Sequence, residues 1–519
     1  MNPPLWSQTA TALKALLDRG EATSEEITHA HLERIDEVNG RLNAFTDVMR
    51  HEAMEVAIKR DHERAAGKLR GPLHGLPVTV KECLAMEGKA STVGVRARRT
   101  HRAGRDAAII QLLREGGAVI TGRTNLSQCM IYAESSNPVF GTTRNAFAHG
   151  RTPGGSSGGE ASAIASGMSC LGVGTDIGGS IRIPCAYSGI YGLMPTLDRW
   201  PLWGSVAGIP GQESIRGVAG PMARSADDLA LLLHAFDPKR MSALDPRTPP
   251  VPWETPESVE GKTFGVLRYD GVFVPSPAVA RALGEAEAAL VRAGAKVVSY
   301  STRILEEAAF LYLGLMSSDG GQTMREVCEG SPIDKPLQGL FRIAKIPAAV
   351  RRVIAAGLER AGEKRAAKAL SALGEKSVSD VWRMHVKLRS LRQELLDEWN
   401  DLGLSAVLCP ATSTPALQLG ASQDFILGMT YTYVWNTMHF PAGVAPVTTV
   451  LRSEERGRII TDALDKKAAN VDAGSTGLPI GVQIVARPYH EATVLGALIA
   501  LDRELRGAPD FPQTPAMFP

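Results

Sequence analysis

The sequence predicts an α/β fold in which helices cover both faces of a central β-sheet. Short apolar segments alternate with amphipathic ones, as in the expected strand Val78–Val80, helix Ala107–Glu115 and strand Ala118–Thr121. This alternation is typical of βαβ units. The chain has 519 residues, of which 44% are hydrophobic and 22% charged. That composition suits a globular protein with one large domain and an insertion.

The first 70 residues are expected to form a helical segment packed on the core. Thr23 to Glu26 match a capping box that would start a helix running to Val38. A second helix is expected over residues 52–66. Residues 71–236, with the strand and helix alternation described above, are expected to form the main part of the core. A small-residue helix over 161–169 should pack closely against the sheet.

The rest of the chain divides into three expected parts, which are a proline-rich connection over 237–262, an inserted lobe with a helical cap over 263–400, and the C-terminal part of the same domain over 401–519. Further strands are expected at 263–267, 296–300, 406–409 and 481–485. A helix over 278–293 separates the first two of these strands. Residues 337–374 form the cap, an Ala-rich, basic and helical segment.

Composition argues against several classes of protein. A net charge of +2 gives no reason to expect a nucleic-acid partner. The six cysteines have no C-x-x-C spacing, which argues against a disulfide scaffold or a zinc site and favours reduced thiols in a cytoplasmic protein. The N-terminus lacks the features of a signal peptide. Phe425–Leu451 is uncharged, but its Asn, His and Pro residues favour a buried helix and strand over a membrane span.

Two glycine-rich loops carry the main functional signal. Ser156 and Ser180 each follow a Gly-Gly pair, and Lys81 ends the apolar run that begins at Leu76. Glycine lets the backbone approach a ligand closely. Serine offers a hydroxyl nucleophile, and a neutral lysine can accept its proton. The combination indicates acyl-transfer chemistry that needs no metal or cofactor.

Other interpretations of these loops fit less well. Gly154–Gly159 lacks the lysine and hydroxyl residue that complete a phosphate-binding loop, and Gly172–Gly178 has one residue too many for a dinucleotide fingerprint. Gly154–Gly158 matches the G-x-S-x-G elbow of α/β-hydrolases, but the preceding Ala148–Pro153 cannot be a central strand. An inactive scaffold is the remaining interpretation. It would lose stability, because glycine loops lose conformational entropy on folding and a desolvated lysine is unfavourable.

The stretch from Gly71 to Leu229 resembles the amidase signature family of serine amidases. Lys81, Ser156 and Ser180 stand where that family has its Ser-cisSer-Lys triad. A further likeness to the branch that hydrolyses fatty acid amides is carried by Lys81–Cys83, Ser136–Thr142, Ser318–Gly321 and Pro441–Val450. The resemblance implies a single domain with a mixed, twisted central sheet and an acyl-enzyme intermediate.

The resemblance also implies a function for each site residue. Ser180 would be the nucleophile, Ser156 the proton relay and Lys81 the base, with a cis peptide bond before Ser156. The backbone N–H groups expected to form the oxyanion hole belong to Ile177, Gly178, Gly179 and Ser180. The residues expected to support the loops are Ser157, Asp176 and Arg182.

Substrate and location are less sharply specified. The resemblance places Met130, Ile131 and Tyr132 beside the substrate, and Phe425–Met429 with Tyr431, Tyr433 and Trp435 could extend an apolar channel. A hydrophobic amide is the expected substrate. The alternatives are an amidase or esterase for small aryl or aliphatic substrates, an amidotransferase A subunit with its partner subunit, and a binding scaffold. A homodimer is expected, and the basic cap over 337–374 suggests peripheral contact with the inner face of a membrane.

Overall fold

The computed structural model describes residues 3–516 and is built around a mixed β-sheet of 11 strands. The strands of the chain are β1 (Phe45–Val48), β2 (Pro77–Lys81), β3 (Val119–Thr124), β4 (Ser136–Asn137), β5 (Gly141–Thr142), β6 (Leu171–Asp176), β7 (Tyr191–Met194), β8 (Val218–Ala223), β9 (Thr263–Leu267), β10 (Lys296–Tyr300), β11 (Ala406–Pro410), β12 (Ala442–Thr449) and β13 (Pro479–Ala486). In the large sheet they lie in the order β1-β3-β2-β6-β8-β7-β12-β13-β11-β9-β10, while β4 and β5 pair separately. Parallel pairs lie toward both ends of the sheet, and antiparallel pairs fill its centre.

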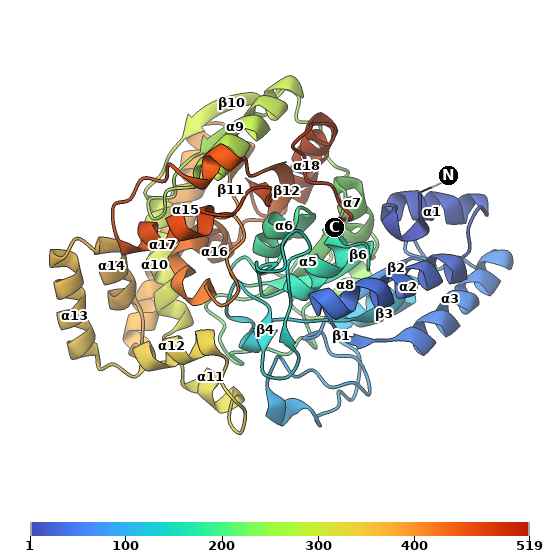
Figure 1. Cartoon of the computed structure of the whole chain (residues 1–519), viewed down its shortest axis with the longest axis horizontal. Helices are drawn as coiled ribbons and strands as arrows, with labels where there is room; N and C mark the ends of the chain where they lie inside the picture. Colours follow the sequence, from blue (N-terminus) through green and yellow to red (C-terminus); the bar gives the residue numbers. More distant parts are fainter. Residues whose placement is uncertain (1–2, 517–519) are drawn as a thin grey trace.

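Helices surround this sheet (Figure 1). They are α1 (Ala10–Arg19), α2 (Ser24–Leu42), α3 (Arg50–Ala65), α4 (Ala108–Glu115), α5 (Gly158–Ala165), α6 (Arg182–Ser188), α7 (Ala226–Leu233), α8 (Pro238–Leu244), α9 (Pro277–Arg292), α10 (Ile304–Met316), α11 (Gln322–Val327), α12 (Lys335–Ala344), α13 (Ala348–Arg360), α14 (Lys364–Ala372), α15 (Val378–Asp401), α16 (Thr430–Met438), α17 (Ala463–Asp472) and α18 (Glu491–Leu505). The predicted α/β class with a mixed sheet is confirmed.

The two faces of the sheet carry different helices. At the centre of the sheet, α18 packs on one face of β12 and contacts the helices α7 and α9. On the other face, α6 packs on β12 and lies beside α5. Successive residues of β12 follow this division: Gly443 faces Leu498 of α18, and Val444 joins the cluster that contains Ala186 of α6. This close packing on both faces makes the central strands almost entirely buried.

Several local predictions hold in detail. The Thr23 capping box is formed, with the side chain of Glu26 accepting from the N-cap backbone. The expected strands over 263–267 and 296–300 have the bounds of β9 and β10. The proline-rich connection contains more structure than expected, because α8 starts with Pro238 in its first turn, a position that suits proline, and buries Met241.

The inserted helices α12, α13 and α14 lie at the opposite end of the molecule from α1–α3 (Figure 1). α14 contacts α10, which also packs on α15 and α16, and α12 contacts the short 3-10 helix over Ser422–Asp424. The uncharged Phe425–Leu451 stretch forms the buried helix and strand that the sequence predicts, α16 and β12. Within residues 3–516, every helix is too short or too polar to cross a membrane.

Candidate active site

Lys81 is the last residue of β2, and its side chain is fully buried. Because β2 runs parallel to β6, with Val80 opposite Val173, the lysine lies beside the end of β6. Its Nζ atom is 2.7 Å from Ser156 Oγ and 2.9 Å from Thr175 Oγ1. The fold therefore brings together the lysine and the first of the two serines that the sequence singled out.

Burial lowers the pKa of this lysine toward neutral pH. Loss of hydration lowers the pKa of Lys81 from 10.5 to about 8, against the opposing effects of Cys83, Asp176 and Glu160. Glu160 lies in α5 and accepts a hydrogen bond of 2.7 Å from the hydroxyl of Thr124. Burial raises the pKa of this carboxyl to about 7. A substantial fraction of Lys81 is thus neutral at mildly alkaline pH.

The Ser156 loop is pressed against a neighbouring backbone segment. The Gly155–Ser156 peptide bond is cis, as the family resemblance implied. A Cβ atom at Gly155 would lie 2.4 Å from the backbone nitrogen of Glu134, so only glycine fits there. Directly after the loop, Ser157 donates its N–H to the carbonyl of Ser180 at 3.1 Å. This bond holds the two serine loops side by side.

Ser180 lies in the turn between β6 and α6. The turn is organised by Asp176, whose carboxylate accepts from the N–H of Gly179 at 2.7 Å and of Ile181 at 3.0 Å. Gly179 has a φ of 115° and its Cα packs so closely on Thr432 that a side chain would clash. The expectation for Gly179 needs correction, because its N–H donates to Asp176 and leaves Ile177, Gly178 and Ser180 as the expected oxyanion donors.

A buried ion pair supports this turn. Arg182 and Asp176 are both fully buried, with 3.1 Å between Arg182 Nη2 and Asp176 Oδ1. Arg182 also donates to Asn436 Oδ1 at 2.6 Å and to Gln483 Oε1 at 3.1 Å. Burial opposes ionisation of Asp176, but the guanidinium and the surrounding donors hold its pKa at about 2. Sequence reasoning found the pair but missed Asn436 and Gln483, which lie far along the chain without a recognisable motif.

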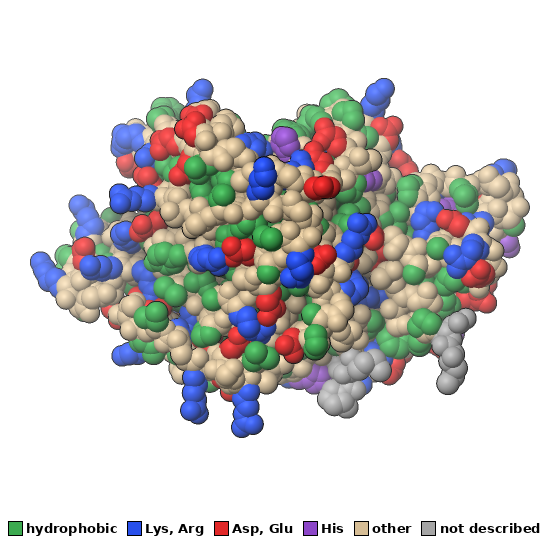
Figure 2. Space-filling model, turned by 90° about the horizontal axis from the view of Figure 1, so that it is seen from above, with side chains coloured by type: hydrophobic (Ala, Val, Ile, Leu, Met, Phe, Trp, Pro, Cys, Tyr) green, Lys and Arg blue, Asp and Glu red, His purple; other side chains and the backbone are tan. Residues whose placement is uncertain are grey.

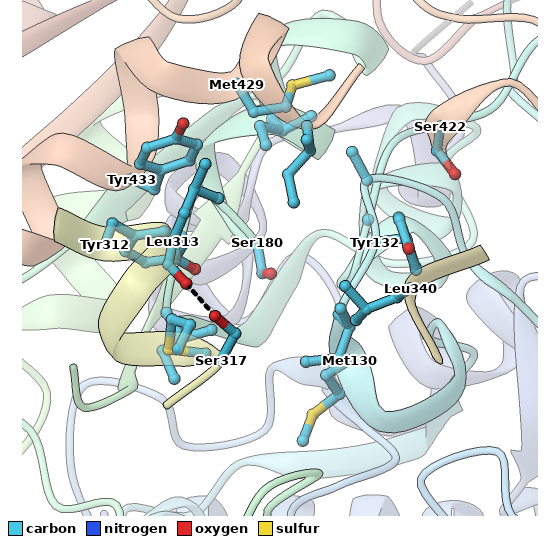
Figure 3. Close-up of a pocket in the computed structure, with 18 of the residues that line it drawn as sticks. Met130, Tyr132, Ser180, Tyr312, Leu313, Ser317, Leu340, Ser422, Met429 and Tyr433 are labelled. Carbon is cyan, nitrogen blue, oxygen red and sulfur yellow. Dashed lines mark hydrogen bonds between the residues drawn. The ribbon is translucent and has the colours of Figure 1, made fainter. Parts of the chain in front are cut away.

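Ser180 opens into an apolar cavity with an empty volume of about 810 Å³ (Figure 3). Met130, Ile131 and Tyr132, which the family resemblance assigns to substrate binding, line this cavity. The wall also includes residues from the C-terminal segment anticipated by the sequence, namely Phe425, Ile426, Met429 and Tyr433. Tyr431 and Trp435 are buried elsewhere in the core and do not line this cavity.

The inserted lobe supplies a part of this wall that the sequence did not indicate. Tyr312, Leu313 and Met316 of α10 line the cavity, and the Tyr312 ring stacks on Tyr433 with 4.4 Å between centroids. Leu340 of α12 closes another side (Figure 3). An amphipathic helix with a core-facing stripe gives no local sign that some of its apolar residues face a cavity.

A second, more polar cavity reaches the same serines from another direction. It has an empty volume of about 1450 Å³ and touches Ser156 and Ser180. Charged residues line it, among them Asp198, Glu213 and Arg216. Met130 and Ile131 border both cavities, so Ser180 lies where an apolar chamber meets a polar one.

Comparison with known proteins identifies the class. The amidase family profile matches residues 26–495, so the chain belongs to the amidase family. It is 35% identical over 515 residues to fatty-acid amide hydrolase 1 of Sus scrofa, covering 97% of this chain and 87% of that protein. It is 30% identical over 506 residues to fatty acid amide hydrolase 1 of Caenorhabditis elegans, covering 95% of this chain and 88% of the relative.

Solved structures agree with this assignment. A fatty acid amide hydrolase structure superposes with a TM-score of 0.85 at 26% identity, covering 98% of this chain and 87% of the other. A bacterial aryl acylamidase of the amidase signature family gives 0.74 at 24% identity with both chains fully covered, a likeness of fold alone. The protein is therefore an amidase signature hydrolase that acts on amide C–N bonds.

Proposed function

We propose that the protein hydrolyses amides of fatty or other hydrophobic acyl groups, with Ser180 as the nucleophile. The observation that carries this proposal is that Ser180 lines the apolar cavity and is bonded through its carbonyl to the loop of Ser156, whose hydroxyl contacts the buried Lys81. The acyl chain would occupy the cavity lined by Met130 and Tyr433. The amine would leave through the polar cavity.

Proton transfer in this proposal runs from Ser180 through Ser156 to Lys81, with its last step along the 2.7 Å contact between Ser156 Oγ and Lys81 Nζ. As the Ser180 hydroxyl attacks the carbonyl carbon, Ser156 accepts its proton and passes its own proton to neutral Lys81. Collapse of the tetrahedral intermediate breaks the C–N bond, and Ser156 returns a proton to the leaving amine. Water then attacks the acyl-enzyme, with the same relay removing its proton, and releases the acid.

The turn after β6 would stabilise the developing oxyanion. The N–H groups of Ile177, Gly178 and Ser180 belong to a turn held rigid by Asp176 and Arg182. Loss of one preorganised oxyanion donor typically costs about 10²–10³-fold in rate. Ser157 would support the arrangement through its backbone bond to Ser180.

Covalent labelling tests the nucleophile. A fluorophosphonate should label the wild-type chain, and peptide mapping should place the adduct on Ser180. Ser180→Ala should remove both the label and at least about 10³-fold of the activity. Ser317→Ala is the matched control, because Ser317 lines the same cavity but its hydroxyl bonds to the carbonyl of Leu313. An adduct on Ser156 or Ser157 would refute the assignment.

A series of amides tests the substrate class. The value of kcat/KM should rise from acetamide through octanamide to oleamide. The reason is that burial of each added methylene in the chamber contributes about 0.8 kcal/mol of binding free energy. A preference for acetamide or benzamide would contradict the fatty-acyl proposal and favour the small-amide alternative. Labelling of Ser180 would be unaffected by that result.

Peripheral membrane contact is a further part of the proposal. α13 exposes the apolar Val350, Val353 and Ile354 and also carries the exposed Arg352 and Arg360. Basic side chains project from the end of the molecule that these inserted helices form (Figure 2). We expect sedimentation with anionic vesicles but not with zwitterionic ones, and Val353→Glu should weaken it. Equal binding to both vesicles would contradict an electrostatic contribution, and the cytoplasmic location stays a prediction.

The expected homodimer has a candidate surface on α15. Val378, Trp382 and Val386 are all exposed and are spaced four residues apart, so they share one side of the helix. An exposed apolar stripe of this kind often marks a protein contact. Trp382→Glu should convert a dimer to a monomer in light scattering, whereas Arg383→Glu on a neighbouring side should not. A monomeric wild-type chain would refute this part.

A further inference from the structure

Two cysteines from distant parts of the chain meet in the interior. Cys129 and Cys328 are separated by 199 positions, yet their Sγ atoms lie 3.3 Å apart. Both side chains are buried, with exposures of 1% and 2%. The other four cysteines are also buried and unbridged, and within residues 3–516 this is the single sulfur–sulfur contact. The pair joins the core to the inserted lobe, because Cys328 directly follows α11.

Neighbouring bonds keep the two segments in register. The Gln128 side chain donates to the carbonyl of Pro332 at 2.9 Å and accepts from the N–H of Asp334 at 2.7 Å. Cys129 itself donates its N–H to the carbonyl of Val93. A disulfide has its sulfurs about 2.05 Å apart, so forming one here requires the two Sγ atoms, now 3.3 Å apart, to approach each other.

The surroundings give the two sulfurs different chemistry. The hydrogen bond between them lowers the pKa of Cys328 and raises that of Cys129. The thiolate is the reactive form of either cysteine. Cys129 borders the larger polar cavity, which offers a small reagent a route toward the pair.

We propose that Cys129 and Cys328 form a redox modification site that a peroxide converts into a disulfide between the core and the inserted lobe. The thiolate of one cysteine attacks one peroxide oxygen, which breaks the O–O bond and, with hydrogen peroxide, gives a sulfenic acid and hydroxide. The hydroxide takes up a proton and leaves as water. The sulfur of the other cysteine then attacks the sulfenic sulfur, forms the S–S bond and releases a second water. Two thiols are oxidised and one peroxide is reduced, and a dithiol reductant reverses the change.

The bond would act on the wall of the substrate chamber. Cys129 immediately precedes Met130, which lines both cavities. Both residues have left-handed backbone conformations, with φ of 53° and 61°. A covalent link here would tie this turn to the inserted lobe and close a long loop, which favours the folded state. The modification is independent of which amide the enzyme prefers.

Peptide mapping provides the test. The full chain, reduced and freed of reductant, is treated with hydrogen peroxide, alkylated and digested without reduction. We expect a linked pair of peptides containing Cys129 and Cys328, the loss of two titratable thiols, and a higher melting temperature that dithiothreitol reverses. Cys129→Ser and Cys328→Ser should each abolish the linked peptide and the shift. Cys409→Ser, also fully buried but outside the pair, should retain both.

Several outcomes would overturn the proposal. The first is a disulfide that involves any other cysteine, and the second is a disulfide that links two chains. A third is over-oxidation of either cysteine of the pair to a sulfinic acid while the other stays reduced. An unchanged melting temperature despite a formed bond would refute the effect on the fold. If the serine variants do not fold, the wild-type map and its reversal by dithiothreitol still decide between these results.

Discussion

Lys81 should make the rate of hydrolysis rise with pH. A lysine that serves as a base must be neutral, and burial lowers the pKa of Lys81 to about 8. By simple titration, about a tenth of the enzyme is then competent at about pH 7 and about nine tenths at about pH 9. The value of kcat/KM should therefore increase about tenfold over this interval.

The direction follows from the sign of the shift. Because the folded-state pKa is depressed, the neutral form is populated at lower pH than for an exposed lysine, and it is lost as pH falls through about 8. Lys81→Met keeps an apolar stem of similar length and removes the amine. It should lower kcat by about 10²–10⁴-fold and abolish the rising limb.

Initial rates of amine release from a hydrophobic amide, measured at constant ionic strength, provide the assay. Lys89→Met is the matched control, since Lys89 lies outside the site in partly exposed ion pairs with Asp47 and Glu52. It should leave both rate and profile unchanged. A flat wild-type profile between pH 7 and 9 would refute the reasoning, as would a Lys81→Met enzyme that keeps the same limb.

Three further predictions concern the surroundings of the site. Glu160→Gln removes a carboxylate that raises the pKa of Lys81, so the midpoint of the kcat/KM profile should move to lower pH; an upward shift would contradict the assigned effect. Asp176→Asn leaves the buried Arg182 without its counter-charge and should lower the free energy of unfolding by about 3–5 kcal/mol, measured as a reduced urea midpoint; a change below about 1 kcal/mol would show that the pair is not needed. Met429→Trp should fill part of the apolar cavity and lower kcat/KM for oleamide more than for octanamide, and an equal effect on both would place the acyl chain elsewhere.

The sequence predicted β9, β10, β11 and β13 but not β6, β7 and β8 in the middle of the sheet or β1 at its edge. β9 and β10 are continuous runs with strand-forming residues, and they were expected at their observed bounds. β6 contains Gly172 and Gly174, and β8 contains Gly220 and Pro221, residues with low strand propensity. Tertiary packing explains some of these choices, because a Cβ at Gly172 would collide with the Glu160 carboxyl.

The site divides in the same way. The sequence by itself determined the candidate lysine and serines, because the glycine-rich loops of the serines and the apolar run that ends at Lys81 are local, and each residue type has a definite chemistry. The tertiary structure decided that Lys81 meets Ser156, that Asn436 and Gln483 support the Ser180 turn, and that α10 of the inserted lobe walls the cavity. A pKa, a cavity and a long-range hydrogen bond all depend on which groups the folded chain brings together and removes from water, and neighbours in sequence do not specify that.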